Sequence, residues 1–76
     1  MYFKDKRFVA FGKHVQELRR ERGVEIKDIV ANTTLSVKDV TAIELGAKNF
    51  GFSTLLELAK GLEVTPSQLL DMDFQV

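Results

Sequence analysis

The stretch GVEIKDIVANTTLSVKDVTAIELG, residues 23–46, decides the fold that we expect for this chain. Its apolar residues fall into two groups at helical spacing, first Ile26, Ile29 and Val30 and then Val40 and Ile43. The glycine at position 23 ends the helix that precedes the stretch, and the glycine at position 46 ends the second helix inside it. The pattern therefore predicts two short helices within about residues 25–45.

The junction between these two helices carries the strongest local signals. Residues 32–35, Asn-Thr-Thr-Leu, form a short polar turn with one apolar residue. Ser36 follows as an N-cap, with Asp39 at the third helical position, which is the spacing of a capping box. Two helices joined by so tight a turn fit a helix-turn-helix, whose second helix can enter a DNA major groove. Because such helical corners are also common elsewhere, the pattern alone leaves DNA binding open.

Three further helices flank this pair. An apolar stripe precedes it at Phe8, Phe11, Val15 and Leu18, and another follows at Leu55, Leu58, Ala59 and Leu62. The last helix starts at residues 65–68, Thr-Pro-Ser-Gln, where proline occupies the first helical position. We expect an all-α, compact five-helix domain over residues 1–76, with its fourth and fifth helices at about 52–72.

Composition narrows the function classes. The chain has 76 residues, no cysteine and one histidine, so the sequence offers no cysteine-based metal site, no thiol nucleophile and no evident enzyme. We expect no cofactor and no metal. No apolar run reaches the roughly 20 residues of a membrane span. The start, MYFKDKRF, has no secretory apolar stretch, so a cytoplasmic location and no membrane partner are expected.

The charge of the chain is zero overall but unevenly placed along the sequence. Residues 1–38 carry nine basic and five acidic side chains, and residues 39–76 carry two basic and six acidic ones. A domain polarised in this way can present one face to a polyanion and another to a different partner.

The residues from about Phe11 to Leu70 resemble the Cro/CI-like (Xre) helix-turn-helix family of phage repressors, restriction–modification controllers and antitoxins, with a lambda-repressor-like fold. The resemblance is carried by Ile43-Glu44-Leu45-Gly46 and by the segment Leu58-Ala59-Lys60-Gly61-Leu62-Glu63-Val64, which continues to Leu69. It implies double-stranded DNA as the partner and transcription regulation as the function.

The resemblance also implies roles for individual residues. The positions that face base edges are Val37, Lys38, Thr41 and Ala42, and those that hold phosphates are Ser36, Lys48, Asn49 and Lys27. Arg19 and Glu44 match a pair that forms a salt bridge between the first and third helices. Three of these assignments have a plainer interpretation: Val37 as a core residue, Lys38 as a solvated lysine, and Arg19 and Glu44 as unrelated surface charges.

Four positions depart from the family pattern. Glu25 and Ile26 stand where a hydroxyl residue and a glutamine usually help to anchor a phosphate. Thr34 occupies a turn position usually held by glycine, although a β-branched residue disfavours positive φ. Phe50 stands where proline is frequent. These departures predict weakened or altered DNA binding on an intact fold.

Surplus apolar residues suggest a further partner. They are Tyr2, Phe3, Phe50, Phe52, Leu56, Met72, Phe74 and Val76. The candidate residues of a homodimer interface are Phe52, Leu56, Leu70, Met72 and Phe74, although the termini can also fold back on their own chain. We expect a sequence-specific transcriptional regulator that binds a palindromic operator as a homodimer. The alternative is a protein-interaction module or an antitoxin-type partner binder with weak DNA affinity. The sequence names neither the operator nor the regulated gene.

Overall fold

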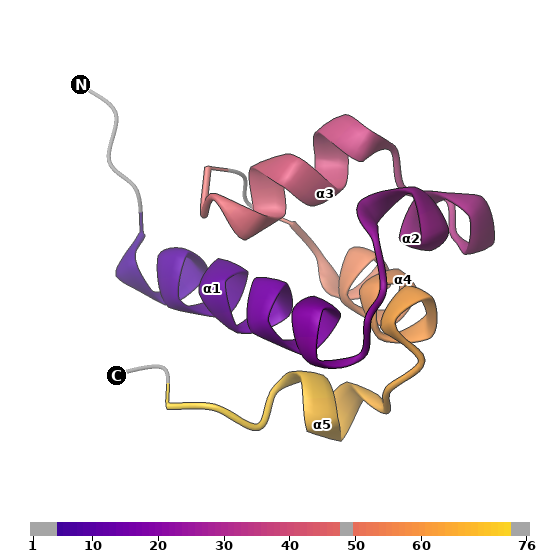
Figure 1. Cartoon of the computed structure of the whole chain (residues 1–76). Coiled ribbons are helices and arrows are strands. Elements are labelled where there is room, and N and C mark those ends of the chain that lie inside the picture. The colour runs from indigo at the N-terminus through magenta and orange to yellow at the C-terminus, as the bar shows by residue number, and fades with distance from the viewer. Residues whose placement is uncertain (1–4, 48–49, 74–76) are drawn as a thin grey trace.

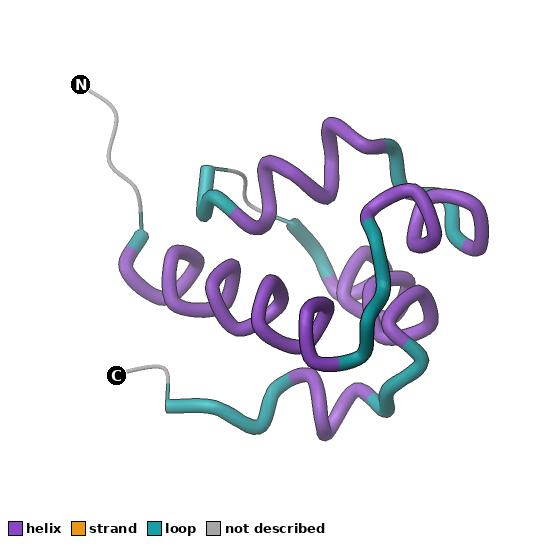
Figure 2. Tube along the Cα trace, in the orientation of Figure 1, coloured by secondary structure: helices purple, strands orange, loops and turns teal. Residues whose placement is uncertain are grey.

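The computed structural model describes residues 5–47 and 50–73, and this part of the chain is helical with no strand (Figures 1 and 2). It contains five helices in the predicted order: α1 (Lys6–Glu21), α2 (Ile26–Asn32), α3 (Val37–Glu44), α4 (Phe52–Leu62) and α5 (Pro66–Leu69). The all-α class and the predicted helix-turn-helix are therefore confirmed.

Side chains fix where most of the helices begin. At α3, the Ser36 hydroxyl accepts from the backbone N–H of Asp39 at 3.0 Å, and the Asp39 carboxylate accepts from the Ser36 N–H at 3.0 Å. Thr65 and Gln68 form the same reciprocal pair at the start of α5. Both capping boxes were expected from the sequence. At α1, the carboxylate of Asp5 accepts from the backbone N–H of Arg7 at 2.8 Å.

The start of α2 is better defined than its sequence indicated. Glu25 is a weak N-cap residue, which led us to expect a poorly specified start. In the structure, the carboxylate of Asp28 accepts from the backbone N–H of Glu25 at 2.9 Å. The third helical position thus supplies the side chain that holds the first turn.

The core draws on all five helices and on the turn between α2 and α3. Its buried apolar side chains are Phe11, Val15, Ile29, Leu35, Val40, Ile43, Leu55, Leu58, Ala59, Leu62 and Leu69. The stripes predicted for α1 and α4 supply six of these residues, so the predicted buried faces are confirmed.

The helices pack so that α3 is held from two sides. It lies against α1 and α2, while α4 packs against α2 and α5 (Figure 1). The approach of α1 to α3 is close at Gly12, where a Cβ would lie 2.6 Å from the carbonyl oxygen of Glu44. Only a residue without a side chain fits this crossing.

The loop before α4 also contributes to the core. The ring of Phe50 lies 5.1 Å from that of Phe8 in an edge-on arrangement and 5.3 Å from that of Phe11. Phe50 is half-buried and packs against the core. It therefore does not belong to the exposed apolar surplus expected from the sequence.

Candidate nucleic-acid interface

The first turns of α3 present a side-chain surface to solvent. Val37 is 55% exposed, and Lys38 and Thr41 are also exposed, whereas Val40 and Ile43 on the opposite face are buried. Val37 is therefore not a core residue, and the plainer interpretation of that position is wrong. Ala42 is half-buried, which limits its contribution to a small apolar contact.

Sequence reasoning missed one member of this surface. Leu45, immediately after α3, is 60% exposed and follows Val37 and Thr41 at intervals of four residues. Residues four apart lie on the same side of a helix. The exposed stripe of α3 is thus largely apolar, with Lys38 beside it as a basic group.

The capping box at the start of α3 also determines what its polar side chains can do. The carboxylate of Asp39 accepts from the Ser36 N–H and so stabilises the first turn. The Ser36 oxygen accepts from the Asp39 N–H, which leaves the proton of the exposed Ser36 hydroxyl available to a phosphate oxygen.

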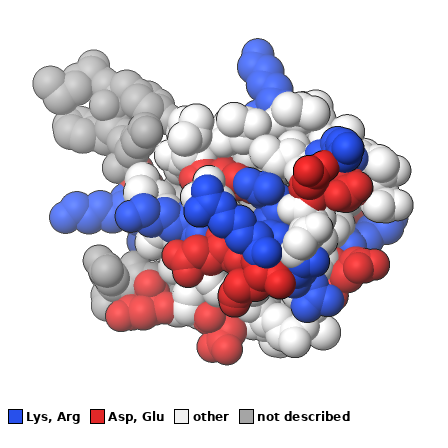
Figure 3. Space-filling model, in the orientation of Figure 1, with Lys and Arg blue, Asp and Glu red and all other residues white. Residues whose placement is uncertain are grey.

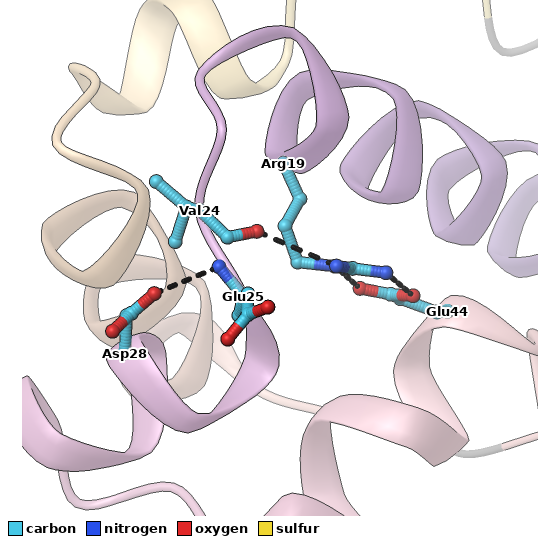
Figure 4. Close-up of polar contacts among 5 residues, drawn as sticks. All are labelled: Arg19, Val24, Glu25, Asp28 and Glu44. Atoms are coloured by element: carbon cyan, nitrogen blue, oxygen red, sulfur yellow. Dashed lines mark hydrogen bonds and ion pairs between the residues drawn. The ribbon is translucent and has the colours of Figure 1, made fainter.

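The predicted ion pair between Arg19 and Glu44 is present and joins the end of α1 to the end of α3 (Figure 4). The Arg19 Nε lies 2.7 Å from Glu44 Oε2 and its Nη2 lies 3.2 Å from Oε1, so the guanidinium binds the carboxylate through two nitrogens. The side chains are only 16% and 6% exposed. Hydrogen bonding to Glu44 raises the pKa of Arg19.

The same guanidinium reaches a third element. Its Nη1 donates to the carbonyl oxygen of Val24 at 3.4 Å, in the segment that leads into α2 (Figure 4). Arg19 therefore fixes α1, the entry to α2 and the end of α3 relative to one another. This arrangement orients α3 without placing Arg19 on its solvent-facing stripe.

The N-terminal turn of α2 is acidic. Lys27, one of the predicted phosphate contacts, is exposed and lies 3.2 Å from the carboxylate of Glu25. Asp28 adds a second carboxylate at this turn. The resemblance implies a phosphate contact at the start of α2, and the two carboxylates at this turn would oppose it.

The turn between α2 and α3 has no left-handed residue. In the described residues, positive φ occurs at Gly23, Gly46 and Glu63. Thr34 therefore does not adopt the strained conformation that its glycine-like position suggested. Its backbone N–H instead donates to the carboxylate of Glu57 on α4, at 2.9 Å.

The remaining predicted residues belong to the phosphate contacts and to the dimer interface, and some of them lie outside the described part of the chain. Lys48, Asn49 and Phe74 lie outside the described residues. Of the remaining candidates for a dimer interface, Phe52 is 72% exposed and Leu56 and Leu70 are each 40% exposed, whereas Met72 is half-buried and packs against the core.

Figure 3 shows one face of the molecule, which carries charges of both signs. Basic and acidic side chains lie interspersed there, although the two halves of the sequence carry opposite net charges. Within residues 5–47 and 50–73, no group of three or more histidine, cysteine or acidic side chains could hold a metal ion. In the same residues, no helix is both apolar and long enough to cross a bilayer.

Comparison with known proteins agrees with this architecture. Residues 14–75 match the family model of the Cro/C1-type HTH DNA-binding domain. The chain belongs to this family. The family consists of DNA-binding transcriptional regulators and is not a class of enzymes.

Two relatives of this Cro/C1-type domain illustrate the range of the similarity. The HTH-type transcriptional regulator DdrOP3 of Deinococcus deserti is 36% identical over 59 residues, which cover 78% of this chain and 46% of the relative. The chain thus spans about half the length of that regulator. The crystal structure of the restriction-modification controller protein C.AhdI from Aeromonas hydrophila matches with a TM-score of 0.77 and 28% identity, covering 83% of this chain and 96% of the controller.

Proposed function

We propose that this Cro/C1-type domain reads double-stranded DNA through the solvent-facing side of α3 and acts as a sequence-specific transcriptional regulator. The proposal rests on the start of α3, which is exposed to solvent while the helix is fixed in position by its neighbours. The Ser36–Asp39 capping box fixes its first turn, and the Arg19–Glu44 ion pair fixes its end. Such a preorganised helix loses little conformational entropy when it enters a groove.

The exposed side chains define the bases that α3 can read. Lys38 can donate to O6 or N7 of guanine, and Thr41 can donate to a base or a phosphate. Val37 and Ala42 have no polar group and can contact a thymine methyl. We assign base reading to these four residues, with Ala42 making the smallest contact because it is half-buried.

Contacts to the DNA backbone would set the register. We assign them to Ser36, Lys27, Lys48 and Asn49, of which Ser36 and Lys27 are exposed in the described residues. Such contacts carry affinity and orientation but do not distinguish one base from another. The acidic turn of α2 should weaken a phosphate contact of Lys27, because the Glu25 carboxylate lies 3.2 Å from its ammonium group.

A homodimer would double the readout. Phe52 and Leu56 on α4 and Leu70 directly after α5 are apolar and exposed, and we assign them to the dimer surface. A two-fold dimer through this surface would place two α3 helices about 34 Å apart, one turn of DNA, and would select a palindromic operator.

Substitution of Lys38 tests the base-reading proposal. Lys38→Ala should weaken binding by ~1–3 kcal/mol, with the loss concentrated at one base pair of each half-site. Lys60→Ala removes an exposed lysine from α4 and is the matched control, for which we expect no change in base preference. Uniform weakening on all sequences would make Lys38 a phosphate contact and would contradict its assignment.

The methyl contact of Val37 has a separate test. Replacing single thymines of the operator by uracil removes only the C5 methyl group. If Val37 contacts a methyl, one such replacement weakens binding to the unsubstituted protein, and Val37→Ala removes that effect. If every replacement weakens both proteins equally, Val37 does not read thymine.

A second candidate function rests on the apolar character of the same stripe. Val37 and Leu45 are both more than half exposed, and the α2 turn that would meet a phosphate is acidic. These features suit a module, such as an antitoxin-type binder, that docks α3 on a protein and binds DNA weakly. Steep loss of DNA affinity with rising salt requires phosphate contacts and would favour the regulator.

A further inference from the structure

The turn of the helix-turn-helix is tied to a helix outside the motif. One carboxylate oxygen of Glu57, in α4, accepts from the backbone N–H of Thr34 at 2.9 Å and from the Thr34 hydroxyl at 3.2 Å. These partners are 23 residues apart in the sequence. The N–H of Thr34 is the main cause that lowers the pKa of Glu57, so the carboxylate is charged at neutral pH.

The neighbouring residues of the turn are held differently. The hydroxyl of Thr33 donates to the carbonyl oxygen of Ile29 at 2.7 Å and accepts from the N–H of Leu35 at 3.2 Å. These bonds tie the turn to α2, and the buried side chain of Leu35 anchors it in the core. Thr34 is the point at which a side chain of α4 also holds the turn.

We propose that Glu57 is a positioning residue for DNA reading: its carboxylate anchors the turn at Thr34 and thereby fixes the start of α3. Val37 and Lys38 follow Thr34 by three and four residues, so movement of the turn moves the side chains to which we assign base reading. This inference rests on the proposed function, but the anchor itself can be measured without DNA.

Two substitutions of Glu57 distinguish loss of its hydrogen bond to Thr34 from loss of its negative charge. A carboxylate near DNA repels phosphates, so its loss alone should strengthen non-specific binding. An amide oxygen at the same place still accepts from Thr34 but carries no charge. Glu57→Gln therefore keeps the anchor and Glu57→Ala removes it, and both variants change the net charge by the same amount.

The test compares these variants with Glu21→Ala, which removes an exposed carboxylate at the end of α1. Amide exchange of Thr34 is measured by NMR without DNA, and affinity is measured for an operator and for an unrelated duplex. Both measurements are made well below the Tm of each variant, which thermal denaturation establishes. We expect Glu57→Ala to speed exchange of the Thr34 amide and to lower the ratio of the affinity for the operator to that for the unrelated duplex. Each effect should be roughly threefold to tenfold, the range expected for one hydrogen bond. Glu57→Gln should keep the exchange rate and the affinity ratio close to those of the unsubstituted protein, and Glu21→Ala should change neither quantity.

A second measurement needs no variant. In the unsubstituted protein, the chemical shift of the Thr34 amide should follow the titration of Glu57, with its midpoint below the usual range of a glutamate because the pKa is lowered. A Thr34 amide that does not titrate, or equal affinity ratios for Glu57→Ala and Glu57→Gln, would overturn the proposal. If the unsubstituted protein shows no preference for any duplex, the proposed function fails, and with it the role of Glu57 in reading. The exchange rates then still decide whether Glu57 holds the turn.

Discussion

Substitution of Gly12 by alanine tests how tightly the reading helix is held. A Cβ at position 12 would fall against the carbonyl oxygen of Ile43 and lie 2.6 Å from that of Glu44 and 2.8 Å from the Glu44 carbonyl carbon. A carbon and an oxygen normally approach to about 3.3 Å. All three atoms belong to the backbone of α3, so α1 and α3 must separate by roughly 0.7 Å or more.

The cost follows from two opposing effects. Alanine stabilises a helix interior by about 0.5–1 kcal/mol relative to glycine. Overpacking costs ~1–3 kcal/mol, and the upper end applies here because rigid backbone atoms cannot turn aside as a side chain can. We expect a net loss of about 2 kcal/mol in the free energy of unfolding, which lowers the Tm of a domain of this size by roughly 10 °C.

Thermal and urea denaturation measure this loss, and Gly51→Ala is the matched control. Nothing lies within 4 Å of a Cβ at position 51, and the backbone there is extended. The control should lose no more than about 1 kcal/mol, through a weaker cap of α4. The folded Gly12→Ala protein should also bind an operator more weakly, because α3 is displaced. A Tm for Gly12→Ala equal to that of Gly51→Ala would refute the close contact between α1 and α3.

Three further predictions concern charged groups. Arg19→Met should lower the free energy of unfolding by about 3 kcal/mol, because it leaves the largely buried Glu44 carboxylate without its partner. The double variant Arg19→Met with Glu44→Leu should recover most of the lost stability. A double variant as unstable as the single one would contradict a stabilising role of the ion pair. Hydrogen bonding from Arg7 lowers the pKa of Asp5 from 3.8 to about 2, so Asp5 stabilises the fold above pH 4 and this contribution disappears as the pH falls towards 2. The difference in Tm between the unsubstituted protein and Asp5→Asn should therefore shrink over that interval, and a constant difference would exclude the carboxylate as its source. Lys48→Ala should weaken binding to all duplexes evenly and reduce the salt slope by about one, whereas an unchanged slope would remove Lys48 from the phosphate contacts.

Local signals in the sequence were sufficient for most of the helices. The capping boxes at Ser36 and Thr65 act over three residues, and the apolar stripes act over one or two turns, so both can be read without knowing the fold. The glycine at position 46 ends α3 with a φ of 69°, as its place in the sequence predicted. The start of α2 was expected to be poorly specified because Glu25 is a weak N-cap residue, whereas the carboxylate that caps the turn belongs to Asp28.

Contacts between segments far apart in the sequence were harder to predict. The ion pair of Arg19 with Glu44 was expected only through the family resemblance, since nothing local relates residues 25 positions apart. The bond from Thr34 to Glu57 had no such guide, and neither had the packing of Phe50 against Phe8 and Phe11. Both features depend on where α4 and the loop before it lie, which only the assembled core determines.

We propose that the exposed side of α3 reads a DNA sequence. Selection from a pool of randomised duplexes, at low and at near-physiological salt, tests it most directly. We expect enrichment of a palindrome whose half-sites lie about one helical turn apart, at both salt concentrations. If no palindrome is enriched at low salt or at near-physiological salt, DNA reading by α3 is contradicted, and the result indicates that α3 binds another protein.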